Sequence, residues 1–183
     1  MGTRRTTPGT SRIDRNNASQ QAHDLAAYLV SALGPTPVGT LKLQKLMYYC
    51  QGWKLAITSE PIVPDRIEAW KHGPVFPAIY RYHSRRAAVE SWEWGDGTNL
   101  SGLDRKIANA VLRTYGDKTG WALREMTHKE EPWRRAWRRS QQNQSRAEEI
   151  PEAAIGEYFE TLQHGASLRA RRHNAPRLRK AAL

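Results

Sequence analysis

The 183-residue sequence contains one cysteine and no long apolar run, and each of these shortages excludes a class of protein. Cys50 alone cannot form an intramolecular disulfide, so nothing supports an exported, disulfide-stabilised protein. Apolar runs such as residues 46–50 are far shorter than the roughly 20 residues of a membrane-spanning helix. The first residues are polar and show no signal peptide. We therefore expect a soluble, cytoplasmic protein without a membrane partner.

Sequence patterns for nucleotide, metal or catalytic sites are also missing. Neither G-x-G-x-x-G nor G-x-x-x-x-G-K-[ST] occurs, and no cysteine or histidine pair has C-x-x-C or H-x-x-x-H spacing. Cys50 falls on an apolar helix stripe, where a thiol is inert. His128, close to Glu130 and Glu131, could act as a general base, but a histidine before a helix more often holds the backbone. We expect no metal, no cofactor and no enzymatic activity.

Positive charge is the main surplus, and it is concentrated at the two ends of the chain. The formal net charge is +11, of which residues 1–15 carry +3 and residues 165–183 carry +6. The stretch between them carries only +2 and holds all 16 aromatic residues. Basic ends without aromatics bury too little apolar surface to offset the entropy of ordering. We expect disordered tails at 1–16 and 165–183, which bind nucleic acid only weakly, and one folded domain at 17–164.

Apolar residues at helical spacing predict a mainly helical domain. The clearest stripe runs from Leu43 to Ile57, and Lys42, Gln44 and Lys45 lie off it. Alternation of polar and apolar residues predicts two short strands. We expect an α+β fold, a compact bundle of about six to seven helices with a small two- or three-stranded β element. The predicted helices span residues 17–33, 40–57, 75–82, 101–114, 119–126, 132–139 and 151–164, and the predicted strands span 66–71 and 91–94.

Capping residues predict where the helices begin and end. Side chains of Ser, Thr, Asn and Asp accept hydrogen bonds from the free N–H groups of a first helical turn, and glycine is common just after the last turn. The predicted N-terminal caps are Asn17 with Gln20, Thr40, Ser101 with Asp104, Thr119, and Thr127 with Glu130, and Gly165 is the predicted end of the last helix.

Residues 132–139 place tryptophan and arginine on opposite faces of one helix. At helical spacing Trp133, Ala136 and Trp137 share a face, and four arginines cover the other. Such arginines bind phosphates or an acidic protein surface. The simpler interpretation is a solvated face whose arginine stems lie along apolar surface. The sequence leaves both interpretations open.

Residues 68–80 predict a rigid turn. They contain two prolines, one glycine and several large aromatics. Gly73 permits a backbone angle that other residues resist, and Pro74 fixes the next one. A turn held in this way is either a packing hinge or a surface presented to a partner.

Three sequence blocks, taken together, resemble one family. They are residues 41–53 (LKLQKLMYYCQGW), 67–75 (IEAWKHGPV) and 123–133 (LREMTHKEEPW). In this order they resemble the Panacea domain, typified by SocA-like antitoxins and phage-associated proteins, over about residues 20–164. Cys50 stands where a small residue such as alanine is expected. The matching residues are Leu43, Lys45, Leu46, Tyr49, Gly52, Trp53, Glu68, Ala69, Trp70, Gly73, Pro74, Val75, Tyr80, Thr127, His128, Pro132 and Trp133.

The resemblance implies an antitoxin, a helical domain that neutralises a protein toxin by binding it directly. The toxin is expected to be encoded next to it, and in some members the domain also delivers the toxin to a protease. The alternative function is a nucleic-acid-binding regulator that uses the basic tails, and an enzyme that uses His128 is a third. We hypothesise that the partner surface contains Trp70, His72, Tyr80, Arg134, Arg135, Arg138 and Arg139.

Overall fold

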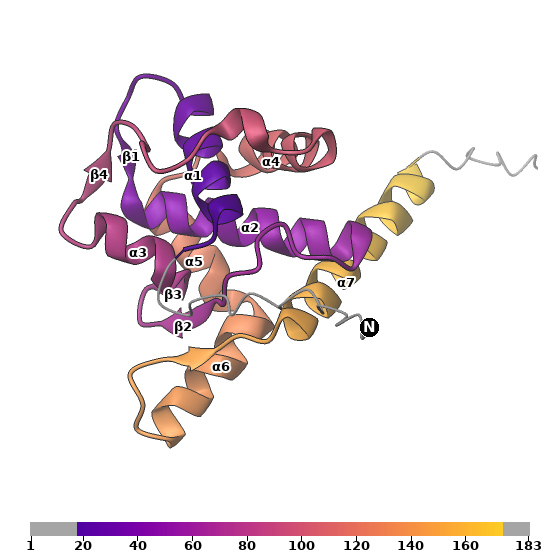
Figure 1. Cartoon of the computed structure of the whole chain (residues 1–183). Coiled ribbons are helices and arrows are strands. Elements are labelled where there is room, and N and C mark those ends of the chain that lie inside the picture. The colour runs from indigo at the N-terminus through magenta and orange to yellow at the C-terminus, as the bar shows by residue number, and fades with distance from the viewer. Residues whose placement is uncertain (1–17, 174–183) are drawn as a thin grey trace, which may run out of the picture.

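The computed structural model describes the backbone of residues 18–173 and the side chains of residues 18–165. This part of the chain contains seven α-helices, one short 3-10 helix and five short strands (Figure 1). The predicted class, mainly helical with a small β element, is confirmed. The elements are α1 (Gln20–Ala32), β1 (Val38–Gly39), α2 (Thr40–Thr58), β2 (Glu68–Trp70), β3 (Gly73–Val75), α3 (Pro77–His83), β4 (Ala88–Val89), η1 (Gly97–Asn99), α4 (Gly102–Tyr115), α5 (Gly120–Lys129), α6 (Glu131–Gln142), β5 (Glu148–Glu149) and α7 (Glu152–His173).

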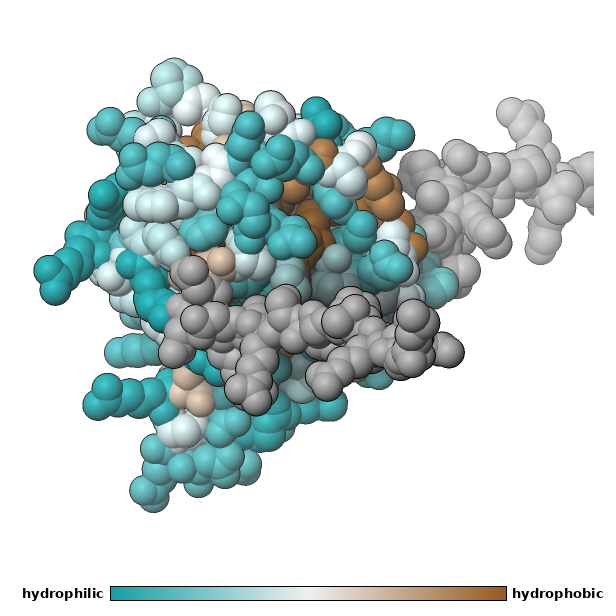
Figure 2. All heavy atoms as spheres, in the orientation of Figure 1, coloured by the Kyte–Doolittle hydropathy of each residue, from teal (hydrophilic) through white to brown (hydrophobic). Residues whose placement is uncertain are grey.

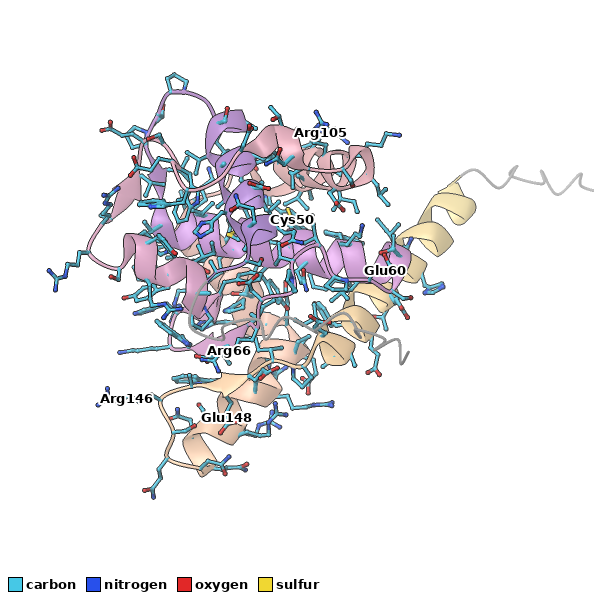
Figure 3. All side chains as sticks on the ribbon, in the orientation of Figure 1. Cys50, Glu60, Arg66, Arg105, Arg146 and Glu148 are labelled. Carbon is cyan, nitrogen blue, oxygen red and sulfur yellow. The ribbon has the colours of Figure 1, made fainter. Side chains whose placement is uncertain are left out.

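Helix α2 lies at the centre of the molecule, and α1, α4, α5 and α7 pack against it (Figure 1). Residues 43–52 are all buried, so this stretch of the helix is covered on every side and not only along its predicted stripe. The stripe itself ends in solvent, because Ile57 is 49% exposed. Gln44, off that stripe, is satisfied in the core because its side-chain oxygen accepts the Phe76 N–H at 2.8 Å. Cys50 lies in the middle of this helix (Figure 3).

Helix α7 crosses α2 at a glycine. A Cβ atom on Gly52 would lie 2.4 Å from the ring of Phe159, so the ring fits only because the side chain is absent. Phe159 is fully buried and makes edge-to-face contacts with Tyr48 and Trp53. A Cβ atom on Gly156, at the same crossing, would meet Leu55 at an ordinary 3.6 Å. The crossing is therefore tight at Gly52 and relaxed at Gly156.

Two small antiparallel sheets lie at the edge of the helical body. Strand β2 pairs with β3 in a hairpin and with β5 on its other side, and β1 pairs with β4. In the hairpin Trp70 lies opposite Gly73, so Lys71 and His72 form the turn. The strand predicted at 66–71 is confirmed by β2, which is shorter than predicted.

The prediction of a strand at residues 91–94 is wrong. The strand in this region is β4, at Ala88–Val89, and residues 91–94 are irregular. Trp92 is buried and its indole N–H donates to Nδ1 of His23 at 3.2 Å, and Trp94 packs on it with ring centroids 5.0 Å apart. The alternation of tryptophan with polar residues therefore reflects an aromatic cluster and not a paired strand.

Two of the predicted N-terminal caps are confirmed and three are wrong. Ser101 and Thr119 accept the expected backbone hydrogen bonds at the starts of α4 and α5. Ser19 and not Asn17 caps α1, where its hydroxyl accepts the Ala22 N–H. Ser19 also hydrogen-bonds to the carboxylate of Asp65, so a tertiary contact selects this residue.

Thr40 does not cap α2, because its hydroxyl donates to the carbonyls of residues 86 and 87 in the neighbouring segment. Thr127 cannot start a helix because α5 continues through it to Lys129, and α6 begins directly after Glu130. Helix α7 passes the predicted stop at Gly165 and continues to His173.

The predicted tails fall largely outside the described residues. This applies to the whole of residues 1–16 and to residues 174–183. Within residues 18–173, no helix combines the length and the apolar character that crossing a bilayer requires.

Candidate functional site

The three sequence blocks come together where the β2–β3 hairpin packs on α2 and α5. Gly73 has a φ of +99°, in the region that favours glycine. A Cβ atom there would lie 2.6 Å from Cε of Lys45 and 2.8 Å from Oγ1 of Thr127. Each of these three residues comes from a different block. The predicted rigid turn is therefore packed between α2 and α5.

Lys45 is fully buried beneath this hairpin. Its Nζ atom donates to the carbonyl of Pro74 at 2.7 Å and so ties the hairpin to the central helix. Burial, reinforced by the charge of Arg124, lowers the pKa of Lys45 to about 7. A buried ammonium group is costly when its hydrogen-bond donors are only partly used. Lys45 therefore places a titratable amine in the core beneath the hairpin.

Three further basic side chains surround Lys45, and we call the four together, Lys45, His72, Arg124 and His128, the cationic cluster. Burial and then the charge of Arg124 lower the pKa of His128 to about 4, while Glu125 raises it. Burial, Arg124 and the neighbouring lysines lower the pKa of His72 as well. Among the described residues, Nε of Arg124 and Nε2 of His128 are buried and have no hydrogen-bond partner. The lowered pKa values favour the neutral forms of Lys45, His72 and His128, so the Arg124 guanidinium is the permanent positive charge of this cluster. Two of the cluster's buried nitrogens have no partner among the described residues.

Aromatic rings connect the cluster to α6. His128 stacks on Trp133, with ring centroids 3.8 Å apart and planes 9° apart, and Trp133 stacks on Trp137. The indole N–H of Trp133 donates to the carbonyl of Trp70 at 3.0 Å. Trp70 in turn contacts Tyr80 edge-on, with centroids 4.8 Å apart. Trp70, Tyr80, His128 and Trp133 therefore form one connected framework.

A buried carboxyl group stands at the junction of α5 and α6. Burial raises the pKa of Glu130 to about 7, although the hydroxyls of Tyr49 and Tyr48 act to lower it. Tyr49 donates to Oε1 of Glu130 at 2.9 Å and stacks on Tyr115 with centroids 4.1 Å apart. The Tyr48 hydroxyl and Oε2 of Glu130 make no hydrogen bond of normal geometry. This group joins α2 to the α5–α6 junction from inside the core.

The four arginines predicted to form one face of α6 lie in two different environments. Arg134 and Arg135 are exposed and lie 3.9 and 3.5 Å from the carboxylate of Glu131. Arg138 is exposed as well. Arg139 is half-buried and donates to a backbone carbonyl of β5 at 3.2 Å, so it attaches α6 to the sheet. Three arginines thus face solvent and the fourth has a structural contact.

The remaining matched residues have packing roles. Leu43, Leu46, Ala69 and Val75 are buried in the core around the hairpin and α2. Glu68 accepts the indole N–H of Trp70 at 2.8 Å. Pro132 lies in the first turn of α6.

Trp121 was not among the predicted site residues, yet it lies against two members of the cluster. Its ring centroid is 5.7 Å from that of His72, and the guanidinium of Arg124 lies 5.6 Å from its centre. In α5 the buried residues are Leu123 and Thr127, and Trp121 falls on the opposite face. The sequence did contain a signal for this residue, namely a tryptophan on the polar face of a predicted helix.

Other surface features lie away from the predicted residues. A hollow of about 710 Å³ is bordered by α1, residues 90–98 and Arg105, and no predicted site residue lines it. The face in Figure 2 is mainly hydrophilic, with a small hydrophobic area over the C-terminal half of α2. Ile57 in α2 is 49% exposed. Among the described residues, no three His, Cys, Asp or Glu side chains gather as a metal ion would require.

Comparison with known proteins gives a curated relative and a family model. Antitoxin SocA of Caulobacter vibrioides (strain NA1000 / CB15N) is 46% identical over 48 residues, which is 26% of this chain and 26% of that protein. No solved structure matches the chain. The sequence model of the family described as "Antitoxin SocA-like, Panacea domain" matches residues 43–134, half of the chain. These residues contain the hairpin, the cationic cluster and the start of α6, and the chain belongs to the SocA-like antitoxin family with a Panacea domain.

Proposed function

We propose that this protein is an antitoxin that neutralises a protein toxin by binding it directly. Membership of the SocA-like family is the observation that carries the proposal. The packing of the matched blocks supports it, because they form a rigid framework of aromatic and basic side chains. A surface fixed in advance loses less entropy on association, and tryptophan and arginine are frequent anchors of protein interfaces.

Co-expression with the neighbouring gene tests the proposal. Induction of a small toxic reading frame next to this gene should arrest growth, and expression of this protein should restore it. Purified protein should also bind the purified toxin with a fixed stoichiometry. Failure of both rescue and binding would remove the antitoxin function for this pair.

Experiments with purified proteins can distinguish neutralisation by binding from neutralisation by catalysis. We propose that binding is sufficient and that the chain is not an enzyme. Inhibition of the toxin should then titrate with the amount of antitoxin and saturate when all toxin is bound. Inhibition by far less than one equivalent would instead indicate catalysis. Rescue that occurs only in cells with an intact protease would indicate that the chain delivers the toxin for degradation.

The exposed arginines of α6 give a prediction about affinity. Replacing Arg134, Arg135 and Arg138 together with glutamate should weaken toxin binding by about tenfold or more, because it reverses the charge of one face. The melting temperature should change by only about 2 °C, because these side chains are exposed. Isothermal titration calorimetry and a thermal melt measure the two effects. Arg139 stays unchanged because it binds β5. Unaltered affinity would remove the arginine face from the partner surface.

A further inference from the structure

Trp121 is an exposed aromatic residue held in a defined position. It is 62% exposed, more than any other large apolar side chain among the described residues. Arg124 covers its ring from one side, and His72 contacts it at an interplanar angle of 83°. Large exposed aromatics beside arginine are typical anchor points for protein partners.

The surroundings of Trp121 carry positive charge that the fold compensates poorly. Lys71 and His72 are exposed on the hairpin turn, and Lys45 and His128 lie beneath it. The acid in contact with Arg124 is Glu125, whose side chain is 60% exposed. An ion pair at that exposure contributes little. The positive charge of Arg124 and of the exposed Lys71 is therefore only weakly compensated within the described part of the chain.

Buried nitrogen atoms without a hydrogen-bond partner also point to a ligand. Buried polar atoms nearly always have partners, and each one without a partner raises the energy of the fold. Nε of Arg124 and the ring nitrogen Nε2 of His128 are two such atoms, close together in one helix. The Arg124 side chain is 21% exposed, so a ligand can approach its guanidinium from solvent.

We propose that Trp121, Arg124 and His72 form the anchor site for the toxin and receive the carboxylate of an acidic side chain. This inference rests on the proposed antitoxin function. The carboxylate binds the Arg124 guanidinium and the His72 imidazole, and an apolar neighbour on the toxin packs against the Trp121 ring. The exposed Lys71, next to His72 in the hairpin turn, adds positive potential. A single anchored carboxylate fits this compact cluster better than a nucleic-acid backbone, which needs a row of phosphate contacts.

Four variants of the full-length chain test the site against the toxin encoded by the neighbouring gene. Trp121→Ala and Arg124→Gln should each weaken binding about tenfold or more in isothermal titration calorimetry. The controls Ile57→Ala, in the exposed part of α2, and Arg113→Gln, on the exposed side of α4, should stay within about twofold of wild type. Thermal melts verify folding, and Arg124→Lys replaces Arg124→Gln if the latter does not fold, with the same weakening expected because lysine lacks the planar guanidinium.

A double-mutant cycle identifies the carboxylate. Each Asp or Glu of the toxin is changed to Asn or Gln and titrated with wild type and with Arg124→Gln. One toxin acid should lose its contribution in the Arg124→Gln background, which shows that the two side chains interact. The His72 ring signals should also titrate at higher pH in the complex than in the free protein, because a bound carboxylate stabilises the imidazolium.

Several outcomes would overturn the inference and leave the antitoxin function intact. One is toxin binding that Trp121→Ala and Arg124→Gln do not weaken. Another is weakening by Ile57→Ala instead, which would place the toxin on the hydrophobic area of α2. A third is the absence of any coupled toxin acid. Binding of a single-stranded RNA that Arg124→Gln abolishes would assign the cluster to phosphate. If wild-type protein does not bind the toxin, the proposed function itself fails and this inference fails with it.

Discussion

At the residue scale, two buried groups have pKa values displaced towards neutrality from opposite directions. Burial lowers that of Lys45 to about 7 and raises that of Glu130 to about 7. Both lie in the core, one beneath the hairpin and one at the α5–α6 junction. The charge inside the fold therefore changes over the physiological pH range.

The lowered pKa of Lys45 predicts how stability depends on pH. Between the folded pKa of about 7 and the ordinary value of 10.5, the unfolded chain binds more protons than the folded chain. The contribution of Lys45 to the free energy of unfolding therefore rises with pH through this window. Lys45→Met should remove that rise, as urea unfolding at a series of pH values would show. The exposed-site variant Lys129→Met is the control and should retain it. An equal rise in Lys45→Met would contradict the assignment.

The sequence predicts individual residues well where the constraint is local. The need for glycine at position 73 is local, and the positive φ confirms it. Burial of Lys45 is not local, because it depends on the Pro74 carbonyl, 29 positions away. A lysine off the apolar stripe of a helix normally faces water. Trp121 was missed for a related reason, since its contact with His72 joins α5 to the distant β2–β3 turn.

At the scale of elements, the crossing of α2 and α7 is a close contact that depends on a glycine. Gly52→Ala should reduce the free energy of unfolding by about 1–3 kcal/mol, because the new methyl group overlaps the buried Phe159 ring. The control Gly156→Ala meets Leu55 at an ordinary distance and should leave stability unchanged or raise it by up to about 1 kcal/mol. Urea unfolding of both variants measures the difference. Equal midpoints for Gly52→Ala and wild type would mean that α7 packs differently.

Helices and strands could be predicted from the sequence where their apolar residues recur at a regular spacing. The predicted helical segments follow from apolar spacing, but several ends differ because tertiary contacts decide them. Asp65 selects Ser19 as the cap of α1, and residues 86 and 87 occupy the hydroxyl of Thr40. Strands of two residues, such as β4, exist only through pairing with a distant partner. Nothing in their own sequence distinguishes them from loops.

At the scale of the whole molecule, one helix organises the described fold. Because α1, α4, α5 and α7 all pack on α2, separating any of them uncovers apolar surface of the same helix. The candidate site uses the same arrangement, since Lys45 belongs to α2 and its neighbours come from the hairpin and α5. The matched blocks can be found from the sequence, but only the fold shows that they lie next to one another.

Because Cys50 lies inside this central helix, the rate at which its thiol reacts reports how often the core opens. The thiol is fully buried and burial raises its pKa, so a thiol reagent reacts only during moments when α2 is exposed. In native protein, labelling should be about a thousandfold or more slower than in urea-unfolded chain. Gly52→Ala should label faster than wild type, and mass spectrometry follows both rates without any added probe residue. Labelling of native protein at the unfolded rate would contradict the burial of Cys50 in the folded state.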